Sequence, residues 1–191
     1  MDRRLIVVAA FTLIAVAVAL AARSPYLAYR DPIYIIAGFA GIIGLGIMVI
    51  QPLMAYRLGI TRRLAWHRWL GAAILVCIGV HIGGLFITSP YDTLDALTLA
   101  SPTPFSVYGV IATAAAIATA LLMLARRSLA YSRWRLVHNA LAVVIVLSTI
   151  IHAVQIEGAM EVASKWLLSA AALAATGYAI WRVHLSRRRA G

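Results

Sequence analysis

The chain has 191 residues, of which 63% are hydrophobic and only 12% are charged, and its mean hydropathy is +0.92. Soluble globular domains are roughly half apolar and about a quarter charged, so this composition excludes an ordinary soluble domain and predicts an all-α integral membrane protein. The formal net charge of +11 does not indicate nucleic-acid binding, because the basic residues lie in short clusters between apolar runs. With the single cysteine Cys77, neither an intrachain disulfide nor covalent C-x-x-C-H haem attachment is possible.

Apolar runs of about 20 residues, the length that crosses a bilayer as a helix, occur six times in the chain. The predicted spans are Leu5–Ala22, Ile33–Ala55, Leu64–Thr88, Val107–Ala125, Trp134–Val154 and Ser164–Val183. We therefore expect a six-transmembrane-helix bundle that forms one domain over residues 1–191. The first run also fits a cleaved signal peptide, but its length favours a retained helix.

Charge is distributed unevenly over the ends of these spans. Fourteen of the seventeen basic residues fall on one side, in the four groups 3–4, 57–68, 126–135 and 182–189. The other side carries three basic residues and five of the six acidic ones. Because lysine and arginine are enriched in cytoplasmic loops, we expect both termini in the cytoplasm. The composition, rich in alanine and arginine, favours a bacterial inner (plasma) membrane.

Four histidines form two pairs with identical spacing inside the third and fifth spans. His67 and His81 are fourteen residues apart, and so are His138 and His152. Fourteen residues of α-helix rise about 21 Å and complete nearly four turns, so both rings of a pair point to a similar side at two depths. Since the third and fifth spans are expected to run in the same direction, His67 is level with His138, and His81 with His152.

Ionisable residues inside a membrane span predict a functional site. Imidazole binds haem iron, zinc, copper or nickel, and no span carries an acidic residue in its interior, as a metal-transport path usually does. We therefore expect two b-type haems, the inner one held by His67 and His138 and the outer one by His81 and His152. A divalent-metal permease is the alternative. Arginines near the inner pair either contact haem propionates or only mark the cytoplasmic side: Arg63, Arg68, Arg133 and Arg135.

The run Arg133-Trp134-Arg135-Leu136, followed by His138 and then by His152, resembles the ferric-reductase-like transmembrane domain. That family includes ferric reductases, NADPH oxidases and the haem-binding membrane subunit of the bacterial methionine sulfoxide reductase system. The six spans and the earlier histidine pair match it as well. The resemblance implies that electrons enter at an inner b-haem on the cytoplasmic side and leave from an outer b-haem.

The donor and the acceptor are expected to be separate molecules. Ferric reductases and NADPH oxidases usually continue into a cytoplasmic FAD and NADPH module, whereas these residues contain no flavin or dinucleotide fingerprint. The donor is then a cytoplasmic flavoprotein, a flavin (FMN or FAD) at the cytoplasmic face, or a quinol. The acceptor is ferric iron, an oxygen species or a partner reductase, with Tyr26, Arg30 and Tyr91 as candidates near an outer acceptor site.

Whether the chain is an enzyme depends on this acceptor. Direct reduction of a small acceptor at the outer haem makes it a transmembrane oxidoreductase. The alternative function is a haem-binding membrane anchor subunit that delivers electrons to a periplasmic reductase such as a methionine sulfoxide reductase.

Overall fold

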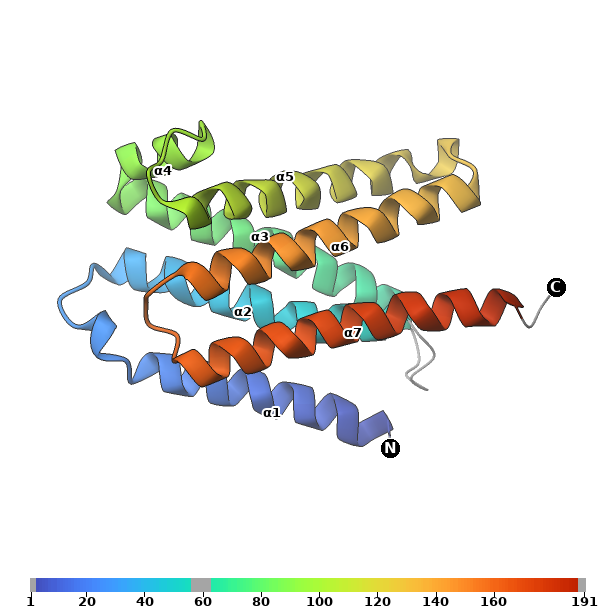
Figure 1. Ribbon diagram of the computed structural model, residues 1–191, viewed down its shortest axis with the longest axis horizontal. Helices are drawn as coiled ribbons and strands as arrows, with labels where there is room; N and C mark the ends of the chain where they lie inside the picture. Colours follow the sequence, from blue (N-terminus) through green and yellow to red (C-terminus); the bar gives the residue numbers. More distant parts are fainter. Residues whose placement is uncertain (1–2, 56–62, 189–191) are drawn as a thin grey trace. The chain divides into compact units, whose positions relative to one another are not determined.

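The computed structural model describes residues 3–55 and 63–188, and the regular structure of these residues is entirely helical. By their contacts the residues separate into unit 1, residues 1–90 with 157–191, and unit 2, residues 91–156. Unit 1 contains α1 (Arg3–Ala22), the 3-10 turn η1 (Pro25–Leu27), α2 (Pro32–Ala55), α3 (Arg63–Thr88) and α7 (Val162–Arg188) (Figure 1). Unit 2 contains nearly all of α4 (Pro90–Leu97), α5 (Pro104–Leu124), the 3-10 turn η2 (Ala125–Ser128) and α6 (Tyr131–Gln155).

Among the described residues, four helical segments are long and apolar enough to cross a membrane. They are Pro32–Ala55, Leu64–Thr88, Pro104–Ser128 and Tyr131–Gln155. These segments coincide with the second to fifth predicted spans, which confirms an α-helical integral membrane protein. Helices also form where the first and sixth spans were predicted, as α1 and α7. The membrane crossing of α1 and α7 stays a prediction, as do the cytoplasmic termini.

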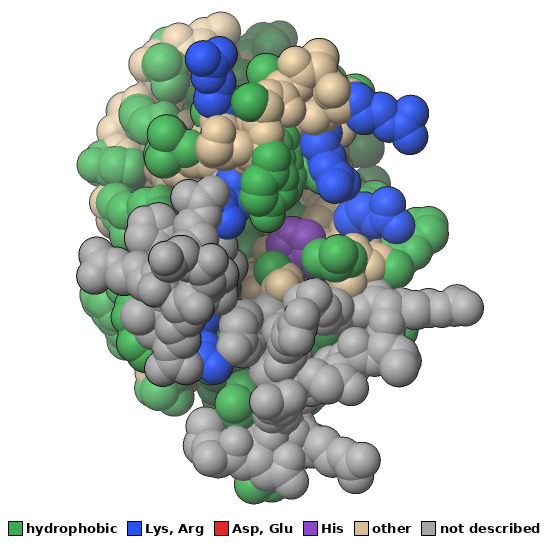
Figure 2. Space-filling view, turned by 90° about the vertical axis from the view of Figure 1, so that its right-hand side faces the viewer, with side chains coloured by type: hydrophobic (Ala, Val, Ile, Leu, Met, Phe, Trp, Pro, Cys, Tyr) green, Lys and Arg blue, Asp and Glu red, His purple; other side chains and the backbone are tan. Residues whose placement is uncertain are grey.

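The basic residues behind the predicted orientation are only partly described. Arg57, Arg62 and Arg189 lie outside the described residues, and so do the side chains of Arg3, Arg4, Arg63, Arg187 and Arg188. Figure 2 looks onto the end of the molecule at which α6 begins. Several arginine or lysine side chains gather on this face, and no acidic side chain is in view. The charged side chains in view on this face are therefore basic.

Proline and side-chain caps decide where several helices begin. Pro90 and Pro104 stand at the first position of α4 and α5, where a missing backbone N–H breaks no hydrogen bond. Glu161 caps α7, because its two carboxylate oxygens accept hydrogen bonds of 2.9 Å from the N–H groups of Ala163 and Ser164. These signals explain why α5 and α7 begin before the predicted spans, and why α4 forms in a stretch predicted as a connection.

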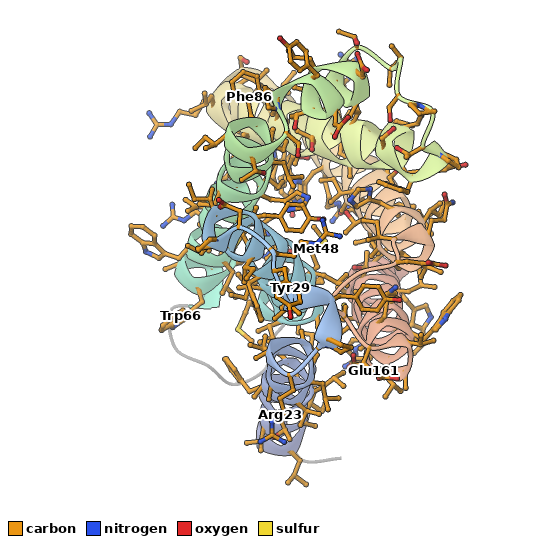
Figure 3. All side chains as sticks on the ribbon, turned by 90° about the vertical axis from the view of Figure 1, so that its left-hand side faces the viewer. Arg23, Tyr29, Met48, Trp66, Phe86 and Glu161 are labelled. Atoms are coloured by element: carbon orange, nitrogen blue, oxygen red, sulfur yellow. The ribbon has the colours of Figure 1, made fainter. Side chains whose placement is uncertain are left out.

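Helix α2 is the central helix of unit 1, where it packs against α1, α3 and α7. Met48 of α2 is 6% exposed and lies among these helices, whereas Trp66 of α3 is 55% exposed and lies at the periphery (Figure 3). The approach of α2 and α3 is close, since a Cβ atom added at Gly84 would lie only 2.8 Å from Cβ of Ala37. Small residues of this kind are what allow helices to pack tightly inside a membrane.

Unit 2 is built on the helical hairpin of α5 and α6, which η2 connects. The buried side chains of these two helices are small or medium in size: Ser106, Ala112, Ala115, Ala116, Val146 and Ser148. Such side chains let the two backbones approach closely. Each unit therefore contains one long hairpin whose second helix, α3 or α6, carries a pair of histidines.

Candidate functional site

The ring of His81 on α3 is held by the neighbouring helix α2. Its Nδ1 lies 2.8 Å from the main-chain oxygen of Ala37. Because a carbonyl oxygen can only accept, Nδ1 must carry the proton and donate it to this bond. The lone pair of the neutral ring is then on Nε2, which is the form that binds a metal through Nε2. Histidine ligands of metals commonly donate their other ring N–H to a carbonyl in this way.

His67 repeats the arrangement fourteen residues earlier on α3. Its Nδ1 donates to the main-chain oxygen of Gln51 at 2.9 Å. Gln51 stands fourteen residues after Ala37, so α2 offers its two acceptors at the same spacing at which α3 offers its two rings. The side-chain amide Nε2 of Gln51 also lies 3.3 Å from Nε2 of His67. Since that ring nitrogen holds the lone pair, the amide is the donor, and a metal at His67 has to replace it.

His152 on α6 has the same support from α5. Its Nδ1 donates to the main-chain oxygen of Phe105 at 2.8 Å. The Phe105 ring meets the imidazole edge-on, with the ring centroids 5.8 Å apart. Three of the four predicted ligands are therefore locked by a carbonyl of the preceding long helix, with Nε2 as the nitrogen left for a metal.

A glycine makes room for the ring in both hairpins. A Cβ atom added at Gly41 would lie 3.2 Å from Nδ1 of His81, and one added at Gly109 would lie 2.9 Å from both Nδ1 and Cε1 of His152. Each glycine stands four residues after the residue whose carbonyl accepts the ring N–H. One turn of α2 and one turn of α5 thus have the same design, a carbonyl acceptor followed by a glycine.

The ring of His138 is supported by an aromatic stack. Trp134, one turn earlier on α6, lies nearly parallel to it, with centroids 5.3 Å apart and an interplanar angle of 13°. Tyr131 stacks on Trp134 at 5.9 Å, and the guanidinium carbon of Arg126 lies 5.4 Å from the Trp134 ring centroid. The indole Nε1 is buried and has no hydrogen-bond partner among the described residues.

The arginines predicted near the inner histidines occupy different surroundings. The guanidinium of Arg135 lies over the ring of Tyr131, 5.3 Å from its centroid. The side chains of Arg68 and Arg133 are exposed, and that of Arg63 lies outside the described residues. Their role as propionate contacts stays a prediction.

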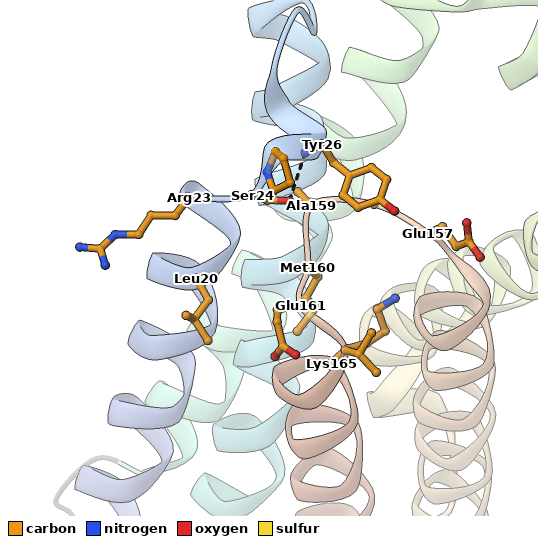
Figure 4. Close-up of a pocket in the computed structure, with 12 residues that line it drawn as sticks. Leu20, Arg23, Ser24, Tyr26, Glu157, Ala159, Met160, Glu161 and Lys165 are labelled. Atoms are coloured by element: carbon orange, nitrogen blue, oxygen red, sulfur yellow. Dashed lines mark hydrogen bonds between the residues drawn. The ribbon is translucent and has the colours of Figure 1, made fainter.

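Unit 1 has a pocket of about 600 Å³ where α1 ends and α7 begins (Figure 4). Lys165 is only 7% exposed, and Tyr26, one of the residues predicted near an outer acceptor site, lines the pocket with it. The two backbone N–H groups that cap onto Glu161, first that of Ala163 and then that of Ser164, hold the pKa of its carboxyl below the ordinary value. Tyr91 and Arg30 do not line this pocket: Tyr91 is 82% exposed, and Arg30 lies over the ring of Tyr34.

Several site residues were missed by the sequence analysis. The carbonyls of Ala37 and Phe105 belong to residues without a distinctive sequence signal, whereas Gln51 is a polar residue in an apolar helix, just before Pro52. Gly41 and Gly109 have a weak one, since each is a glycine inside an apolar helix. Within the described residues, no group of three or more His, Cys, Asp or Glu side chains is placed to hold a metal ion.

The helices and the histidines together define the class of the protein. It is an all-α integral membrane protein that carries paired histidines inside its apolar helices. Residues 37–149, more than half of the chain, match the family model described as ferric reductase like transmembrane component, and the chain belongs to this family. The match includes His67, His81 and His138 and ends three residues before His152. At a coarse level the family indicates transmembrane electron transfer. No curated protein and no solved structure matches the chain.

Proposed function

We propose that this protein carries electrons across the membrane through two b-type haems. His67 and His138 would hold the inner haem, and His81 and His152 would hold the outer one. The observation that supports this most strongly is the tautomer of three imidazole rings, those of His67, His81 and His152. Each donates its Nδ1–H to a main-chain carbonyl and keeps its lone pair on Nε2. Haem iron, when bound, supplies the one-electron ferric–ferrous chemistry.

The residues of the chain have three tasks in this proposal. The carbonyl hydrogen bonds fix the tautomer and the orientation of the rings and raise the basicity of the ligating nitrogen. Glycines at positions 41 and 109 give two of the rings their space. The apolar helices keep water away from the centres, and low polarity around a haem is one of the determinants of its potential.

Haem fits this donor set better than a bare divalent cation does. The porphyrin supplies four equatorial nitrogens, so each haem needs only two imidazoles from the protein. A permease for zinc or nickel needs three or four protein ligands at each binding position.

The direction of transfer follows from the predicted topology, in which α1 and α7 complete six spans and both termini are in the cytoplasm of a bacterium. Electrons enter the inner haem from a cytoplasmic flavoprotein, a bound FMN or FAD, or a quinol. They leave the outer haem for ferric iron, an oxygen species or a periplasmic reductase. Charge supports this orientation, because acidic residues gather on the predicted outer side and arginines on the inner side.

The first test is the reduced-minus-oxidised absorbance spectrum of the purified full-length protein, with a pyridine haemochrome assay to count haem per chain. We expect close to two b-haems in the native protein and one in each of His67→Ala, His81→Ala, His138→Ala and His152→Ala. His184→Ala is the matched control, because His184 has no partner at the fourteen-residue spacing, and it is expected to retain both haems. A protein without haem, after expression with haem available, contradicts the proposal.

A second experiment decides what the acceptor is. The haems of the purified protein are reduced chemically, and their reoxidation by a ferric chelate is followed by absorbance. Rapid reoxidation supports a transmembrane ferric reductase. Reoxidation that needs an added periplasmic methionine sulfoxide reductase supports the anchor-subunit alternative. In either case His81→Ala, which removes an outer ligand, is expected to slow the transfer while the inner haem is retained.

A further inference from the structure

The indole N–H of Trp134 is a buried donor with no acceptor among the described residues. Buried polar groups are nearly always hydrogen-bonded, and a missing partner costs about 1–3 kcal/mol. A native protein that keeps such a donor commonly satisfies it with a group from outside the chain. We therefore expect a bound molecule with a hydrogen-bond acceptor next to the indole N–H of Trp134.

The surroundings of the indole restrict what that acceptor is. The ring is fixed by His138 on one side, at 5.3 Å and 13°, and by its contacts with Tyr131 and Arg126. A ring held in this way cannot turn to find another partner at low cost. The nearby guanidinium of Arg126 favours an acceptor with negative charge, because opposite charges attract.

Trp134 also lies where a group ligated by His138 is within reach. The two residues are four positions apart on α6, so they share one face of the helix, and their rings are in contact. A b-type haem carries two carboxylates, which are strong acceptors of charge-assisted hydrogen bonds. Trp134 and His138 thus lie one turn apart on the same face of α6, with their rings stacked.

We infer that Trp134 is a haem-binding residue whose indole N–H donates a hydrogen bond to a carboxylate of the inner haem. This inference rests on the proposed function and adds a residue to the inner site. It assigns the carboxylate contact to an uncharged side chain, in addition to the arginines predicted from the sequence. The stack also holds the His138 ring in its orientation, so Trp134 both binds the haem and positions its ligand.

The test compares two substitutions in the full-length protein. Trp134→Phe keeps an aromatic ring for the stack but removes the N–H, and Trp134→Leu removes both. A hydrogen bond to a charged group contributes enough that we expect haem at the inner site to dissociate roughly tenfold more readily in Trp134→Phe, measured by haem transfer to an excess of an apo-globin. Trp69→Phe is the matched control, since Trp69 is 73% exposed, and it is expected to change nothing.

Two readouts separate a hydrogen bond from a packing effect. The resonance Raman bending band of the haem carboxylates is expected to shift in Trp134→Phe and not in Trp69→Phe. The haem-free form of Trp134→Phe is expected to unfold at the same temperature as the haem-free native protein or at a higher one, because an unsatisfied donor is removed. Equal losses of stability in the haem-free and haem-bound forms contradict the inference and assign Trp134 to packing.

The acceptor of this N–H has a second source, the phosphate of a lipid headgroup. Unchanged haem release and an unchanged Raman band in Trp134→Phe, together with loss of co-purified phospholipid, overturn the inference in favour of that source. Failure of the proposed function has a different signature, in which His138→Ala retains both haems. If His138→Ala loses one haem while Trp134→Phe behaves as the native protein, only the role of Trp134 is wrong.

Discussion

Replacing Gly109 by alanine tests the support of the outer ligand directly. The added Cβ atom would lie 2.9 Å from Nδ1 and from Cε1 of His152. Carbon atoms in contact normally stay about 3.5–4.0 Å apart, so the imidazole has to move by roughly 0.6 Å away from α5. Helix α5 also carries the carbonyl of Phe105 that accepts the ring N–H at 2.8 Å. The movement therefore stretches this bond to about 3.4 Å, beyond the usual range of an N–H···O hydrogen bond.

The expected magnitude follows from the lost bond. A buried donor left without its partner costs about 1–3 kcal/mol, and crowding in a packed interior costs a similar amount. This cost destabilises the orientation in which the His152 ring binds haem iron, so haem affinity at the outer site is expected to decrease by roughly fivefold to a hundredfold. Gly41→Ala places its Cβ 3.2 Å from Nδ1 of His81, so the effect there is expected to be smaller but of the same kind.

The assay is haem titration into haem-free protein, followed by absorbance and by the low-spin signals of the two ferric haems in electron paramagnetic resonance. Gly38→Ala is the matched control, because its added Cβ meets nothing within 4 Å and the substitution is the same change inside an apolar helix. Gly109→Ala is expected to fill one site normally and the other weakly. If Gly109→Ala binds two haems with native affinity and native signals, the carbonyl–glycine support of His152 has no role in ligation.

Three further predictions address other parts of the molecule. Gln51→Leu removes the side-chain amide that covers Nε2 of His67 and leaves the main-chain carbonyl in place. The inner site is therefore expected to bind haem about fivefold more tightly in titrations. Weaker binding would show that the amide assists haem binding instead. The lowered pKa of Glu161 means that its cap on α7 stabilises the protein fully above its ordinary value of 4.5 and is lost as the pH falls through the lowered pKa. Glu161→Gln is therefore expected to flatten the decrease in unfolding temperature from pH 6 to pH 3, and an unaltered pH profile would count against the cap. Gly84→Ala forces α3 away from α2 and is expected to destabilise the protein by about 1–3 kcal/mol in thermal unfolding. Gly83→Ala is the control, because its added Cβ meets open space, and it is expected to be neutral or stabilising. Equal effects of the two substitutions would contradict the close packing of α2 and α3.

Much of the helical architecture was predictable, because the signals that determine it are local. A run of apolar residues long enough to cross a bilayer has to satisfy its own backbone hydrogen bonds, so Ile33–Ala55 and Leu64–Thr88 fold as α2 and α3 almost as predicted. The helix α4 was missed because its eight residues are too short and too polar to register as a span. Its signals were present in Pro90 at the first position and Asp92 in the first turn.

The positions of the candidate ligands along their helices were also predictable from the sequence. The carbonyls that accept their ring N–H groups were not. The distance and direction from His67 to His81, and from His138 to His152, follow from their spacing of fourteen residues, because both members of a pair lie on one helix with a fixed rise and turn per residue. Which carbonyl a ring reaches depends on the register of two helices: Ala37 is 44 residues from His81, and Phe105 is 47 from His152. Side-chain packing across the hairpin decides that register, and no pattern within either helix encodes it. For the same reason only the tertiary structure revealed that Gly109 faces a ring and that the indole N–H of Trp134 is buried without an acceptor among the described residues.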